Sequence, residues 1–149
     1  MDGLSNKITI EFRFNASKKV DQALVKSHKH RILVEVEGEL FVFIDGELFF
    51  HDEYILLMEL GISLFKWKES SRRGIVESFH YQTMDYDEGP ILELIKIDRE
   101  NWKIYSIWQK FESNELIPFK ILQKGINTFL ENLENELEKQ DMIDIRSYL

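Results

Sequence analysis

The sequence predicts an α+β domain, with an antiparallel sheet of about six to seven strands and two amphipathic helices packed on one face, in the order β-βββ-α-βββ-α. Three observations predict this class. Several short segments alternate apolar and polar side chains, as strands with one buried face do. Two longer segments repeat apolar residues every three or four positions, as amphipathic helices do. Runs of strands separated by single helices are typical of α+β domains.

A single domain is expected over residues 1–149, because two prolines and seven glycines leave no flexible linker. Along residues 7–14 apolar and polar side chains alternate, which predicts the first strand. Residues 17–30 are expected to form a loop or a short irregular element. A meander of three strands is then predicted over residues 32–36, 40–44 and 47–50.

Turn chemistry separates these three strands. The first turn is expected around Gly38 and the second at Asp45-Gly46, because both residues of an Asp-Gly pair tolerate the positive φ of a tight hairpin. Asp52 is expected to cap the first helix, since its carboxylate can accept from the free amides of the first turn. That helix is predicted to end near residues 67–69.

The second half of the chain predicts three more strands and a second helix. The strands are expected within residues 74–84, 91–97 and 102–111. The helix is predicted to begin at Pro118, a residue suited to the first helical turn, and to run for about six turns. The tail, residues 141–149, is expected to be peripheral.

The composition excludes several classes of function. The chain has no cysteine, which excludes disulfides, thiolate metal sites and a cysteine nucleophile, and suits a cytoplasmic location. A net charge of −8 opposes binding to nucleic acid. No uncharged stretch approaches the ~20 apolar residues of a membrane-spanning helix. A cytoplasmic protein that binds neither nucleic acid nor membrane is therefore expected.

Acidic side chains and an imidazole lie close together at Asp45, His51, Asp52 and Glu53, and this cluster is either a reactive centre or a turn followed by a helix cap. A strand between Asp45 and Asp52 would separate them by roughly 17 Å, too far to share a proton or a metal ion. The second interpretation is therefore favoured. Because no motif of a hydrolase or nucleotide-binding enzyme occurs either, no catalytic, cofactor-binding or metal-binding residue is predicted.

An acidic loop with tyrosine is the first candidate for a contact with another protein. Asp85 and Asp87 are spaced like the start of a calcium loop, but Pro90 stands where that loop requires glycine. The same loop suits an arginine or lysine of a partner. Aromatic side chains on solvent-exposed sheet faces are typical anchors for protein partners. The predicted contact residues are Asp85, Asp87, Glu88, Tyr86, Tyr81 and Trp102.

The chain resembles the small acidic immunity proteins that bacteria encode beside polymorphic toxins. The resemblance rests on size, acidity, lack of cysteine, and the succession of "HDEYILLMELGISLFKW", "NWKIYSIWQKF" and "FLENLENELEKQ". It implies a non-catalytic protein that occludes a basic toxin domain. Two alternatives stay open: a small-ligand-binding or enzymatic domain with a pocket lined by His80, Tyr81 and Trp108, and a homodimer that pairs sheet edges.

Overall fold

A computed structural model gives the structure of the protein and describes residues 4–15, 22–23, 32–33, 35–74, 76–82 and 89–149. Its elements follow in the order β1 (Ile8–Phe14), β2 (Glu37–Ile44), β3 (Glu47–Leu56), α2 (Leu57–Arg72), β4 (Phe79–Tyr81), β5 (Leu92–Lys96), β6 (Asn101–Tyr105), β7 (Ile117–Pro118), α3 (Phe119–Asp141) and a final 3-10 turn, η2 (Ile145–Tyr148). The α+β class is confirmed, with seven strands and two long helices among the described residues.

The strands form two antiparallel sheets and not the single sheet that the sequence predicts. One sheet has the order β1-β2-β3 and the other the order β4-β5-β6-β7. Because β3 passes directly into α2, the chain leaves the first sheet before β4 begins. The sheets remain linked through the connection after β6, where Lys110 N donates to the Phe49 carbonyl at 2.7 Å and Leu4 forms a bridge with Leu116.

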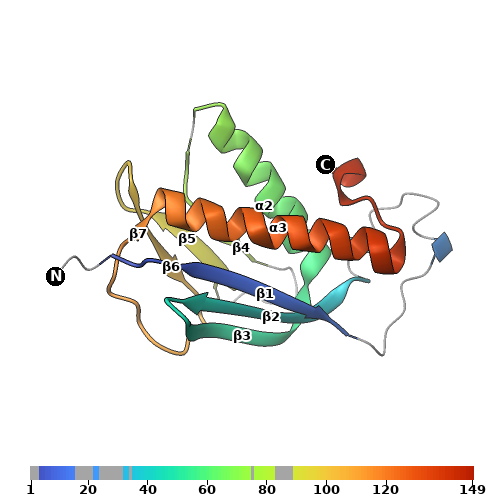
Figure 1. Ribbon diagram of the computed structural model, residues 1–149, viewed down its shortest axis with the longest axis horizontal. Helices are drawn as coiled ribbons and strands as arrows, with labels where there is room; N and C mark the ends of the chain where they lie inside the picture. Colours follow the sequence, from blue (N-terminus) through green and yellow to red (C-terminus); the bar gives the residue numbers. More distant parts are fainter. Residues whose placement is uncertain (1–3, 16–21, 24–31, 34, 75, 83–88) are drawn as a thin grey trace.

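Both long helices pack against the strands and against each other. In Figure 1, α3 runs along β1 toward the C-terminal turn, and α2 rises behind it. One continuous core joins both sheets, both helices and the tail. Among the described helices, none is both long enough and apolar enough to cross a bilayer.

The hairpin predicted at Asp45-Gly46 is confirmed. Asp45 has φ of 51° and Gly46 has φ of 83°, the left-handed conformations that a tight turn requires. The Asp45 carboxylate also accepts from the backbone amides of Asn6 and Lys7, at 2.7 and 2.9 Å. This side chain therefore joins the turn to the segment that leads into β1.

The predicted turn at Gly38 is wrong, as is the strand over residues 32–36. Gly38 lies inside β2, opposite Phe14 and Ile55. A Cβ atom at Gly38 would lie 2.3 Å from the carbonyl oxygen of Arg13. The glycine is therefore required by a close approach between two strands, which local turn chemistry does not reveal. Ile32 lies in a short 3-10 segment before β2 begins.

The predicted helix cap at Asp52 is also wrong, because β3 continues to Leu56 and α2 begins at Leu57. Pairing with β2 extends the strand as far as Glu37 opposite Leu56. Two register shifts bend β3 along the way, and one of them brings Phe49 and Phe50 both into the core although they are neighbours. Strand pairing thus overrides the local preference for a cap.

The second helix is confirmed: α3 spans 23 residues, directly after Pro118. The tail, by contrast, is not peripheral. Ile143 and Ile145 are completely buried, and a Cβ atom at Gly61 of α2 would lie 3.1 Å from the Ile145 side chain. The C-terminal turn therefore completes the core beside α2.

Candidate functional site

The acidic and histidine side chains singled out in the sequence do not converge. Asp45 lies in the hairpin turn, and the Asp52 carboxylate accepts from the amide of Tyr54 at 3.1 Å. His51 stacks on Phe41, with ring centres 4.5 Å apart, and its Nε2 lies 2.9 Å from a Glu39 carboxylate oxygen. Nowhere in the described part of the chain do three His, Asp or Glu side chains gather to hold a metal ion.

The predicted partner contacts fall into two groups. Asp85, Tyr86, Asp87 and Glu88 lie outside the described residues. Tyr81 and Trp102 are 3% and 1% exposed, so in this chain on its own their rings belong to the core and present no surface to a partner.

Tyr81 and Trp102 have clear structural roles. The Tyr81 hydroxyl donates to a Glu59 carboxylate oxygen at 2.9 Å, and burial together with this negative neighbour raises the pKa of Tyr81 well above its usual value. The Trp102 ring meets Trp67 edge to face at 5.7 Å and stacks on Phe119 at 5.5 Å. Both side chains tie the second sheet to a helix.

The proposed liners of a small-ligand pocket also lie apart. On β4, Tyr81 is buried while its neighbour His80 is exposed, because adjacent side chains of a strand point to opposite faces. Trp108 lies in the turn after β6, where it stacks on Phe50 with ring centres 6.3 Å apart. These three side chains therefore do not line one cavity.

The free edge of β1 is the candidate site among the described residues. Among the described residues only β2 pairs with β1, which makes β1 an edge strand. The Lys7 carbonyl accepts from Asp45 N at 2.9 Å, and Asn15 N donates to the Glu37 carbonyl at 3.1 Å. The odd-numbered residues of this segment therefore direct their backbone groups toward β2.

Alternation along the strand then fixes the direction of the backbone N–H and C=O groups of the even-numbered residues. In an antiparallel pair, N–H and C=O of one residue point to the same side, and the next residue points to the opposite side. The backbone groups of Ile10, Phe12 and Phe14 therefore point to the free edge, where no described residue pairs with them. Unpaired groups of this kind are a template for another strand.

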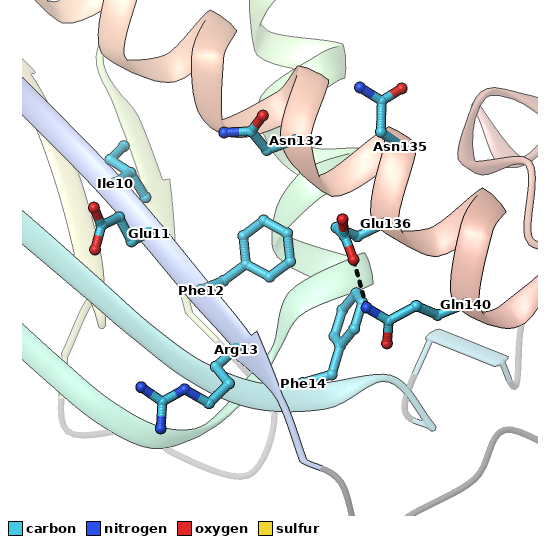
Figure 2. Close-up of a pocket in the computed structure, with 9 residues that line it drawn as sticks. All are labelled: Ile10, Glu11, Phe12, Arg13, Phe14, Asn132, Asn135, Glu136 and Gln140. Atoms are coloured by element: carbon cyan, nitrogen blue, oxygen red, sulfur yellow. Dashed lines mark hydrogen bonds between the residues drawn. The ribbon is translucent and has the colours of Figure 1, made fainter.

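A groove follows this free edge, between β1 and α3 (Figure 2). Its two halves have volumes of about 650 and 530 Å³ and share Ile10, Glu11 and Asn132 in their walls. Figure 2 shows the rings of Phe12 and Phe14 pointing from β1 toward α3. Both rings are only partly buried, so the groove has an apolar floor beside its free backbone.

The wall of the groove on α3 is a polar row at every fourth residue. Positions four apart lie on the same face of a helix. The row consists of Lys124, Thr128, Asn132, Glu136 and Gln140. Within it the Gln140 amide donates to the Glu136 carboxylate. This spacing is visible in the sequence and is the signal by which this wall could have been predicted, whereas the free edge opposite it depends on the strand order.

Helix α3 touches the edge at the beginning of β1. A Cβ atom at Gly125 would lie 2.6 Å from the carbonyl oxygen of Ile8, so helix and strand touch there. Glycine is what permits this approach. From Ile10 to Phe14 the edge faces the groove, and no described residue pairs with this length of strand.

Comparison with known proteins gives one match. A family model described as "Domain of unknown function (DUF7878)" matches residues 10–139, which cover β1 from Ile10 onward, α3 as far as Lys139 and most residues of the groove between them. No curated protein and no solved structure matches the chain.

Proposed function

The chain belongs to the DUF7878 family, a domain of unknown function, and on that premise we propose that it is a non-enzymatic protein-binding domain that accepts an extended segment of its partner as an additional strand on β1. The observation that carries the proposal is the row of outward backbone groups at Ile10, Phe12 and Phe14 beside the groove. Strand addition of this kind obtains affinity from main-chain hydrogen bonds and specificity from side-chain contacts.

The energetics favour a strand over a compact ligand. Three residues offer three N–H donors and three C=O acceptors, and each main-chain bond contributes about 0.5–1.5 kcal/mol net. A strand placed there also covers the partly exposed rings of Phe12 and Phe14. The polar row of α3 supplies amides and charges that can contact alternate side chains of the segment.

Peptide selection against the full chain tests this proposal. Peptides of about seven residues would be selected from a random displayed library, and binding would be mapped by the amide shifts of the protein. We expect the largest shifts at Ile10, Phe12 and Phe14, together with slowed hydrogen exchange at these amides. The amides of Thr9 and Glu11 are internal controls, because they already face β2.

Two matched variants make the test specific to the groove. Asn132→Trp places a large ring in the exposed wall of the groove, whereas Asn114→Trp makes the same change at an exposed position in the connection before β7. We expect the first variant to weaken peptide binding at least tenfold and the second to leave it unchanged. Equal effects of both variants, or shifts confined to other surfaces, would refute strand addition on β1.

The more specific form of the proposal is an immunity protein that occludes a toxin. It is supported by the resemblance to small acidic immunity proteins and by the net charge of −8, which suits a basic partner. Reversing the charges of Asp85, Asp87 and Glu88 is then expected to slow association with a toxin and reduce its salt dependence. Coexpression with the product of the neighbouring gene provides the assay. If the Asn132→Trp variant still protects cells against the toxin, toxin occlusion does not depend on the groove.

A further inference from the structure

The charges along the groove are not evenly distributed. At the end near the beginning of β1, the walls carry Lys7 and Lys124, both exposed, and no described carboxylate forms an ion pair with either. At the other end the charged side chain of the α3 wall is Glu136. The groove is thus positive at one end and negative at the other.

The remaining charges of the groove do not reverse this polarity. Arg13 forms an ion pair with Glu39 at 3.6 Å and points away from α3 in Figure 2. At the other end the Asp45 carboxylate, which accepts from Lys7 N at 2.9 Å, offsets one of the two lysine charges and leaves that end positive. Glu11 lines both halves and lies near the middle. The difference in charge between the two ends therefore comes from Lys7 and Lys124 at one end and Glu136 at the other.

The two ends act on a bound strand separately. The seven residue-to-residue steps of strand from Lys7 to Phe14 span about 24 Å at ~3.4 Å per residue. This length is about three times the Debye length of ~8 Å at physiological ionic strength. A charge at one end of a bound segment is therefore attracted or repelled only by the groove charges nearest to it.

Strand pairing sets the direction of the segment. Antiparallel pairs have better-aligned hydrogen bonds and are slightly more stable per residue than parallel pairs. A segment antiparallel to β1 begins beside Phe14 and Glu136 and ends beside Ile10, before the contact between α3 and Ile8 and near Lys7 and Lys124. Its amino end then faces the negative end of the groove, and its carboxyl end faces the positive end.

We propose that the groove selects segments that run antiparallel to β1, with a cationic residue near the amino end and a carboxylate near the carboxyl end. This inference rests on the proposed strand addition and specifies the class of partner segment. An exposed ion pair changes affinity by a factor of about 1.4 to 5, and a like-charge contact has a similar effect in the opposite direction. Together, the two ends should give about tenfold discrimination between a matched and a reversed segment.

The experiment compares two octapeptides of identical composition. Both are acetylated and amidated and have a core of alternating threonine and valine; one carries arginine first and glutamate last, and the other has these two residues exchanged. Titration of the full chain, followed by the amide shifts of Ile10, Phe12 and Phe14, gives both affinities. We expect the first peptide to bind about tenfold more tightly at low salt.

The double variant Lys124→Glu with Glu136→Lys keeps the net charge of −8 and reverses the polarity of the α3 wall. It is expected to reduce or invert the preference between the two peptides. As a second measurement that needs no variant, the preference of the wild-type chain should fall to about twofold or less in 1 M salt, where the Debye length is ~3 Å.

The outcomes distinguish the two proposals. Equal affinities at low salt, or a preference for the reversed peptide, would overturn the proposed direction and charge pattern and leave strand addition intact. If neither peptide shifts the amides of Ile10, Phe12 and Phe14 at millimolar concentration, strand addition itself fails, and this inference fails with it.

Discussion

Replacing Trp102 with alanine is expected to lower the free energy of unfolding by about 4 kcal/mol. The ring is 1% exposed and is held between Trp67 and Phe119. Burial of roughly 200 Å² at ~25 cal/mol per Å² gives an upper value of about 5 kcal/mol. Tryptophan-to-alanine changes in protein cores cost about 3–5 kcal/mol. For a chain of this size the melting temperature should then fall by about 8–16 °C.

Urea denaturation followed by far-ultraviolet circular dichroism measures this loss, because the substitution itself changes the fluorescence. Tyr54→Ala is the matched control, since this aromatic side chain is 66% exposed. The control should stay within about 0.5 kcal/mol of the wild type. If Trp102→Ala were equally mild, the ring would not be part of the core, and its role as a partner contact would again be the better explanation.

Three further substitutions test other parts of the fold by the same denaturation assay. Tyr81→Phe removes the hydrogen bond to Glu59 and should lower the free energy of unfolding by about 1–3 kcal/mol. Because the pKa of Tyr81 is raised in the folded state, the wild type should lose stability as the pH rises above about 10, and the variant should lose less. An equal pH dependence would contradict this. Asp45→Ala removes two acceptor contacts at a left-handed position and should cost about 1–2 kcal/mol, whereas no loss would show that the turn does not depend on this side chain. Ile145→Ala should cost about 2–5 kcal/mol, whereas a peripheral tail would show almost no change.

Local sequence patterns predicted the elements whose geometry depends on near neighbours. Alternation predicts β1, and the three- and four-residue repeat after Pro118 predicts α3. The Asp45-Gly46 turn is predictable because positive φ is a property of these two residues themselves. In each of these segments, local preference and tertiary packing favour the same structure.

The errors occur where a contact distant in sequence decides the conformation. Asp52 has the chemistry of a helix cap, but pairing with β2 holds it in β3. Gly38 has the chemistry of a turn, but it is a strand residue that lets the Arg13 carbonyl approach. A single sequence does not reveal which strands pair, so it cannot distinguish these roles.

Only one wall of the groove could be predicted from the sequence. The polar row on α3, from Lys124 to Gln140, is present in the sequence at a spacing of four. The opposite wall depends on the position of β1 at the edge of its sheet, because an interior strand would have no unpaired backbone. Residue type alone predicts aromatic contacts such as Trp102, and it does not distinguish a core ring from a surface ring.

The position of α3 also bears on whether a second copy of the chain could occupy the β1 edge. Two β1 strands paired antiparallel about Glu11 would place Phe14 of each opposite Ile8 of the other. Helix α3 already reaches the edge at Ile8, where only a glycine at 125 permits the contact, so it would obstruct the partner strand at both ends of the pair. A single extended segment carries no such helix and can end before Ile8. In this register, the helix that leaves the backbone from Ile10 to Phe14 open to a lone strand disfavours pairing between two identical edges, and covering part of an edge is one way in which edge strands are protected against self-association.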